Sequence, residues 1–327
     1  MQRIDLDMKR GVALAVSFLL LSASGLIAED ENSAFDDFQR LVQAAAPSTV
    51  QEALKRDHPG SSPQQQREQF EKKTTESALA IMERATELEK RYPQNTRLVQ
   101  VRSSVKQTLS MVFGFMGLPI PRSRVAEVEA CTRGLLAAGG KDAGLHMVLF
   151  RIATALPNEQ QRARFEELSH GPTSERASTS AKAALRNLER LGLPLNLNFN
   201  SPDGHVISLE HLKGKVVLID FWAPACGPCV RDLAGLKELY AKYRAQGLEI
   251  VGISKDPDEE ALGRFVEKNQ LPWPQKYDGS ASTNQVAEAY GIVEIPVVWL
   301  VDRHGLLRDL DGREDQERKI AALLKEP

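Results

Sequence analysis

Two cysteines separated by two residues are the part of the sequence best suited to chemistry. Cys226 and Cys229 enclose Gly227-Pro228, and this spacing brings two thiols close enough to form a small disulfide ring. Such a pair serves either as a redox-active dithiol or as half of a zinc site. The sequence has only three cysteines and no histidine at ligand spacing from the pair, so we interpret the motif as a dithiol without a metal.

The dithiol lies between a predicted strand and a predicted helix. Val216–Phe221 is a run of β-branched and apolar residues, which is typical of a buried strand. Val230–Gln246 repeats apolar residues at steps of three and four, which predicts an amphipathic helix. We therefore expect Cys226 at the N-terminal end of a helix, where backbone N–H groups and the helix dipole favour a thiolate.

The sequence around the dithiol alternates short strands with helices from Leu195 onward. The pattern predicts further strands at 197–199, 206–209, 248–254, 297–301 and 308–310, and helices at 258–269, 282–290 and 314–324. This order predicts an α/β domain over residues 194–327, with a mixed sheet flanked by helices.

Residues 33–191 predict an all-helical domain, because Ala, Leu, Glu, Arg and Gln dominate and no alternating segment occurs. Pro and Gly breaks place the helices at 34–46, 64–91, 96–116, 122–138, 143–156, 159–168 and 174–191. No repeat with a period of about 34 residues is evident, so the role of this domain stays open. Cys131 falls on the apolar face of its helix, and we interpret it as a buried apolar side chain.

The pattern of residues in the N-terminal segment, residues 1–28, predicts that the protein is exported. Basic residues precede an uncharged apolar run at 11–28, which is the layout of a signal peptide or, if uncleaved, of a membrane anchor. We therefore expect the rest of the chain in the periplasm or cell envelope, secreted or anchored by residues 11–28. Such a compartment contains disulfide-bonded proteins on which a dithiol can act.

Composition excludes several classes of protein. The chain has 327 residues, enough for two domains, with 42% hydrophobic and 26% charged residues, which excludes wholesale disorder. Its net charge of −2 predicts no nucleic-acid partner. We expect contact with a membrane only through the N-terminal segment.

The C-terminal domain resembles the thioredoxin superfamily, specifically the exported thiol:disulfide oxidoreductases of the TlpA/ResA type. The resemblance covers about residues 195–324. Three segments in order carry it: Leu212–Ala223, the Cys-Gly-Pro-Cys motif, and Tyr290–Asp302 with its Ile295-Pro296 pair. It implies a thioredoxin-like fold for the domain that follows the helices.

The resemblance also implies roles for individual residues. Cys226 would be the attacking thiolate, and Cys229 the buried thiol that resolves the mixed disulfide. Asp220 would be a buried carboxyl whose raised pKa suits it to take the proton of Cys229, although a strand-end carboxylate in solvent is the alternative. Pro296 would follow a cis peptide bond and present the main chain of Ile295 to an extended client.

The remaining predicted site residues lie around the dithiol. Trp222, Gly227 and Pro228 belong to the expected substrate-binding surface, although core packing alone also explains Trp222. Two positions depart from the family pattern. Ala225 replaces the usual Trp, which changes the contact surface, and Asp232 replaces the usual Glu. Asp232 is either an acid acting on the dithiol or an ordinary acid in the first turn of a helix.

These inferences predict an exported protein-disulfide reductase that supports redox homeostasis and antioxidant activity. The Gly-Pro pair between the cysteines is that of thioredoxin, whose potential is about −270 mV. The expected partners are client thiols or disulfides and an upstream thiol–disulfide donor, and the Cys226–Cys229 disulfide takes the place of a cofactor. The alternatives are an interaction protein built on the helical domain with a redox tether, and a peroxiredoxin-type thiol peroxidase.

Overall fold

The computed structural model describes residues 30–58, 60–61, 63–139, 142–200, 206–256, 258–277, 285–313 and 315–326. The chain divides between Thr108 and Leu109 into two compact units, the N-terminal unit and the C-terminal unit. This division falls inside the stretch 33–191 that composition groups together. The predicted signal or anchor lies outside the described residues. In the part of the chain that is described, no helix is long and apolar enough to cross a membrane.

The N-terminal unit is helical, as its composition predicts. It contains α2 (Glu31–Ala44), α3 (Pro47–Asp57), α4 (Pro63–Arg91) and most of α5 (Leu98–Leu109). Helix α3 is absent from the sequence prediction, which took Pro47 as a break. In the structure Pro47 opens the helix, where its missing N–H has no intrahelical partner to lose. The core is made by apolar side chains of these helices: Phe35, Phe38, Val50, Leu54, Ile81, Leu88 and Val101.

The C-terminal unit begins with further helical structure. It consists of a π-helical turn at Ser110–Phe115, a 3-10 turn at Arg122–Arg124, and helices α6 (Val125–Gly139), α7 (Ala143–Thr154), α8 (Asn158–His170) and α9 (Glu175–Glu189). The π turn interrupts a helix predicted to run to Met116. At this turn, Gly114 lies against the backbone of Gly144, where an added Cβ would be 2.4 Å from a carbonyl oxygen. Cys131 is half-buried in α6.

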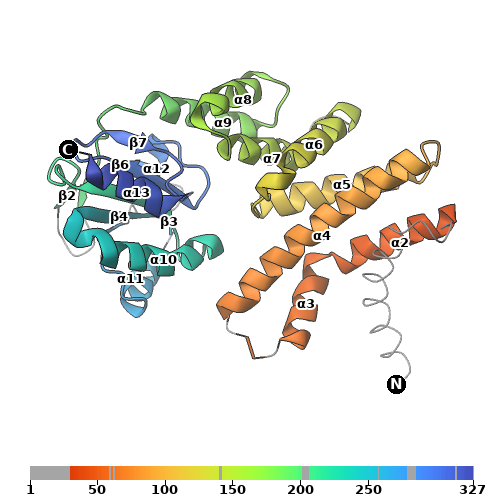
Figure 1. The fold of residues 1–327 in the computed structure, drawn as a ribbon, viewed down its shortest axis with the longest axis horizontal. Coiled ribbons are helices and arrows are strands. Elements are labelled where there is room, and N and C mark those ends of the chain that lie inside the picture. The colour runs from red at the N-terminus through yellow and green to blue at the C-terminus, as the bar shows by residue number, and fades with distance from the viewer. Residues whose placement is uncertain are drawn as a thin grey trace. The chain divides into compact units, whose positions relative to one another are not determined.

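The rest of the C-terminal unit has a five-stranded mixed sheet, which confirms the predicted α/β fold class (Figure 1). Its order is β5-β4-β3-β6-β7, and the strands are β3 (Val216–Trp222), β4 (Leu248–Ser254), β5 (Gln275–Tyr277), β6 (Val297–Val301) and β7 (Leu307–Asp309). Strands β3, β4 and β5 are parallel, whereas β6 and β7 are antiparallel to their neighbours. A separate hairpin pairs β1 (Asn198–Asn200) with β2 (Val206–Ser208).

Strand β3 is buried along its whole length and separates two apolar layers. On one face, Val216, Leu218 and Trp222 join a cluster with α10 (Gly227–Tyr243), α11 (Glu259–Lys268) and α13 (Gln316–Lys325). On the other face, Val217, Ile219 and Phe221 pack with the hairpin and α12 (Gln285–Ala289). Because side chains alternate along a strand, Asp220 belongs to the first face, under the helix that carries the dithiol.

The turn after α9 is joined to the sheet through backbone hydrogen bonds, and α9 itself through a side chain. The N–H of Gly192 donates to the carbonyl of Leu307 at 2.7 Å, and the N–H of Leu307 donates to the carbonyl of Leu193 at 3.0 Å. The side-chain amide of Asn187 donates to the carbonyl of Tyr290 at 2.8 Å. Helix α9 and the turn that follows it are therefore packed against the sheet within the C-terminal unit.

Candidate active site

The two cysteines form a disulfide at the start of α10. Cys226 is the N-cap residue, and the N–H of Cys229 donates to its Sγ atom at 3.3 Å. The two Cα atoms are 5.3 Å apart. Cys226 is partly exposed, whereas Cys229 is 2% exposed. The helix N-terminus stabilises negative charge on the accessible sulfur, which suits Cys226 to be the attacking thiolate of the reduced form.

Asp220 is a buried carboxyl near the first turns of α10. It is 3% exposed, and burial raises its pKa to about 7. The negative charge of Asp232 raises the pKa further, and the positive charge of Arg313 opposes it. A carboxyl with this pKa can both accept and release a proton at neutral pH. The alternative of a solvated strand-end carboxylate does not fit this burial.

Asp232 is paired with an arginine that the sequence analysis does not identify. The Nε and Nη2 atoms of Arg313 lie 2.8 and 2.7 Å from Oδ2 of Asp232. Both side chains are partly exposed. Asp232 lies beyond the first turn of α10, so it is not a first-turn acid. In this arrangement Asp232 influences the dithiol region through its charge on Asp220.

The peptide bond between Ile295 and Pro296 is cis. Ile295 contacts the apolar clusters on both faces of the sheet, which fixes the segment just before β6. The ammonium group of Lys255 donates to the carbonyls of Ile292 and Val293, at 2.7 and 3.2 Å. Burial of the Lys255 ammonium group lowers its pKa. The cis-proline loop, residues 292–296, is therefore fixed by the apolar contacts of Ile295 and by the hydrogen bonds from Lys255.

Helices of the C-terminal unit also hold the cis-proline loop. Arg151 of α7 and Arg176 of α9 lie 2.7 and 3.0 Å from the two carboxylate oxygens of Glu294. Burial lowers the pKa of Arg151, and the charge of Glu294 opposes this effect. No local sequence signal identifies these partners, because they join segments far apart in the chain.

The other predicted site residues differ in how deeply they are buried. Trp222 is 0% exposed, and its indole N–H donates to Oε1 of Gln275 at 2.9 Å, so it supports the site from below. Ala225 is exposed beside the dithiol, and Gly227 and Pro228 are partly exposed at the start of α10.

The described residues contain no group of three or more His, Cys, Asp or Glu side chains arranged to hold a metal ion.

Comparisons with known proteins relate the C-terminal part of the chain to thiol-disulfide oxidoreductases. A sequence profile described as the AhpC/TSA family matches residues 194–310. The thiol-disulfide oxidoreductase ResA of Halalkalibacterium halodurans is 34% identical over 121 residues, which are 37% of this chain and 67% of the relative. ResA of Bacillus anthracis is 31% identical over 124 residues, 38% of this chain and 70% of the relative.

One solved structure matches a similar share of this chain. The thioredoxin domain of thiol-disulfide oxidoreductase BVU-2223 from Bacteroides vulgatus is 28% identical, covers 41% of this chain and 98% of its own, and has a TM-score of 0.37. The chain spans 66% of the length of a ResA from Bacillus thuringiensis at 30% identity. Through residues 194–310 the chain belongs to the AhpC/TSA family, with the thiol-disulfide oxidoreductases of the ResA type as its relatives.

Proposed function

We propose that this chain is a thiol:disulfide oxidoreductase that reduces disulfide bonds of client proteins. The observation that carries the proposal is the stacking of three groups on one face of the sheet. An accessible Cys226 caps α10, a buried Cys229 follows it, and Asp220 with a pKa of about 7 lies on the strand beneath that helix.

The reaction would proceed in two exchanges. The thiolate of Cys226 attacks one sulfur of a client disulfide, the client S–S bond breaks, and one client thiolate leaves. Cys229 then gives its proton to Asp220 and attacks the Sγ atom of Cys226, which releases the second client thiolate. Two electrons pass from the dithiol to the client, and both client thiolates take up protons.

The reduced dithiol must then be regenerated by an upstream thiol–disulfide donor. Gly227-Pro228 between the cysteines supports a reductant, since thioredoxin with the same pair has a potential of about −270 mV. The uncharged run at residues 11–28 supports export to the periplasm or cell envelope, with or without cleavage. The site itself requires no cofactor beyond its own disulfide.

Trapping of mixed disulfides tests this function. In the full exported chain, Cys229→Ser removes the resolving thiol, so client proteins should accumulate in disulfide linkage to Cys226. Cys226→Ser is the matched control and should trap none. Equal trapping by both variants would exclude the exchange mechanism.

A second measurement separates this function from the alternatives. If the reduced protein consumes peroxide far faster than a free thiol, the thiol peroxidase is favoured. If the biological function survives Cys226→Ser but is lost on removal of residues 34–191, the helical interaction protein is favoured.

A further inference from the structure

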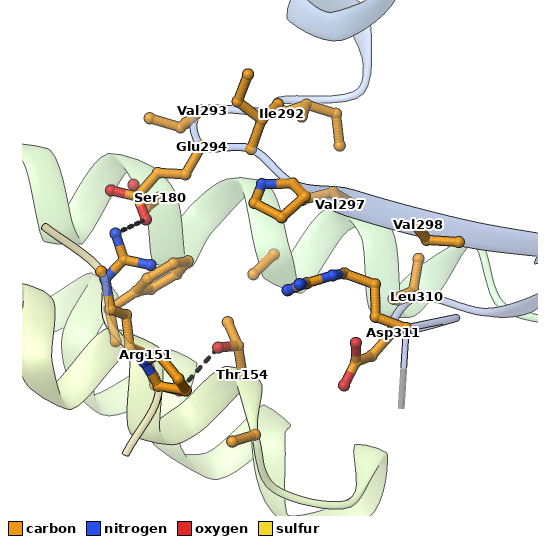
Figure 2. A pocket seen from close by; sticks show the side chains of 18 of the residues that line it. Arg151, Thr154, Ser180, Ile292, Val293, Glu294, Val297, Val298, Leu310 and Asp311 are labelled. Atoms are coloured by element: carbon orange, nitrogen blue, oxygen red, sulfur yellow. Dashed lines mark hydrogen bonds and ion pairs between the residues drawn. The ribbon is translucent and has the colours of Figure 1, made fainter. Parts of the chain in front are cut away.

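A cavity of about 440 Å³ lies beside the dithiol, inside the C-terminal unit. One wall belongs to the thioredoxin-like part and includes Pro228 of the dithiol loop and Ile295-Pro296 of the cis-proline loop. The opposite wall comes from residues 116–120 and helices α7, α8 and α9. Figure 2 shows Arg151 and Thr154 on the helical side, and Glu294, Val297 and Asp311 on the sheet side.

The helical wall is mainly apolar. Leu118, Ile120, Phe150 and Phe165 line it, and Phe150 stacks on Phe165 with ring centroids 5.5 Å apart. A volume of this size falls in the range of about 300–1,000 Å³ that is usual for ligand sites. It can hold one or two large side chains of a client, but not a folded element.

The charges at the cavity are compensated within the protein. The carboxylate of Glu294 is bound by Arg151 and Arg176, and Arg313 is bound to Asp232. Burial raises the pKa of Asp311, and the charges of Lys319 and Arg313 oppose this effect. These contacts leave little demand for a charged ligand, so they favour an apolar one.

One polar group of the cavity lacks a partner. Ser180 of α9 lines the cavity, is 2% exposed, and its hydroxyl makes no hydrogen bond in the structure. A buried hydroxyl without a partner costs free energy that a bound acceptor would recover. The carbonyl of an extended peptide is such an acceptor, and a peptide also carries the apolar side chain that the rest of the wall fits.

We propose that this cavity binds the residue next to the reactive cysteine of the client, and that it selects Leu, Met or Phe at that position. This inference rests on the proposed function and names its substrate class. Client selection would then depend on α7–α9, which lie outside residues 194–310, the part that matches the AhpC/TSA profile.

Short peptides with a single cysteine provide the probe. Each peptide carries its cysteine as a mixed disulfide with thionitrobenzoate, and the residues beside the cysteine are varied between Ala, Leu, Phe, Asp and Lys. Attack by Cys226 on the peptide sulfur breaks the S–S bond and releases thionitrobenzoate, which is followed by its absorbance. Cys229 then displaces the peptide thiol, so the two electrons of the dithiol reduce the disulfide.

The reduced full chain should show a kcat/KM about tenfold higher for the Leu and Phe peptides than for the Ala peptide, because burying the larger side chain strengthens binding. Asp and Lys should give no gain over Ala. Ala184→Phe fills the cavity from α9 and should bring the Leu-to-Ala ratio near one. Thr179→Phe adds the same bulk at an exposed position of α9 outside the cavity lining and should keep the ratio.

Ser180→Ala gives a second test that does not depend on bulk. It should lower kcat/KM for all peptides by about three- to tenfold without lowering the melting temperature, since the deleted hydroxyl bonds only the bound peptide. A purely structural role would lower the melting temperature instead, and that result would overturn the assignment of Ser180 to the ligand.

The outcomes separate the cavity from the underlying function. If no peptide reacts faster with the wild type than with Cys226→Ser, the proposed exchange function fails. If peptides react through Cys226 but Leu and Ala are equivalent, or if the preference survives Ala184→Phe, exchange stands and the cavity proposal is overturned.

Discussion

Asp220 combines burial with a pKa of about 7, compared with an ordinary value of 3.8. Burial is the main cause, since the charged form loses its hydration inside the sheet. Between these two pH values the folded protein binds more protons than the unfolded chain. Ionisation of Asp220 therefore destabilises the fold, and this cost is complete only above about pH 7.

The free energy of unfolding of the oxidised protein should fall as pH rises from about 4 to about 7, by the contribution of Asp220. Asp220→Asn should remove this slope and make the variant more stable than the wild type at pH 8, by roughly 2–4 kcal/mol. Urea denaturation at a series of pH values measures both effects.

Glu238→Gln, a change at an exposed carboxylate of the same helix α10, is the matched control and should keep the wild-type slope. An unchanged slope in Asp220→Asn would show that other groups cause it.

At the scale of elements, the contact between α9 and the end of α12 needs a glycine. Gly291 has a φ of +62°, and an added Cβ would lie 2.5 Å from the Cβ of Ala183. The residue directly precedes the cis-proline loop, so the close approach fixes where that loop leaves the helix.

Gly291→Ala should therefore destabilise the protein by about 2–4 kcal/mol, through the left-handed backbone and the overpacked contact with α9. Urea denaturation measures the loss. Adding Ala183→Gly should recover only the packing part, because the φ angle stays unfavourable. Full recovery in the double variant would mean that the backbone conformation contributes nothing.

Buried elements with a strong local pattern were predicted well from the sequence. The bounds expected for β4 and β6 are those observed, because both are rich in β-branched and other apolar residues. Strand β5 was missed, since Gln275-Lys276-Tyr277 has no apolar pattern and forms its pairing only at the sheet edge. The spacing of the two cysteines identifies the dithiol, whereas Asp220 and Pro296 are predicted from the resemblance to a known family.

The partners of the site residues had no such signal. Arg313 binds Asp232 from 81 positions away, and the arginines of α7 and α9 reach Glu294 across a still longer stretch of sequence. These contacts depend on tertiary packing, which neither composition nor periodicity records.

At the scale of the whole molecule, the compact unit from Leu109 onward is larger than the region shared with the relatives, residues 194–310. Helices α7 and α9 provide the arginines that pair with Glu294, and the turn after α9 provides the backbone partners of Leu307 in β7. The thioredoxin-like part therefore depends on helices that precede it in the chain.

A fragment of residues 109–327 should unfold in one cooperative transition. A fragment of residues 194–327 should be less stable by about 3–5 kcal/mol, because Leu307 loses its backbone partners and Leu310 loses its apolar contacts with the helices. Urea denaturation of the two fragments compares them directly. Equal stability would mean that the helices are an independent attachment.

The ion pair of Arg313 with Asp232 affects how the pKa of Asp220 depends on the concentration of dissolved salt. Asp220 faces two opposite charges at a short separation, which act on it as a dipole rather than as a single charge. Dissolved salt screens both members of the pair together, so their opposing effects fall in parallel. The proton affinity of Asp220 is thereby buffered against changes in ionic strength.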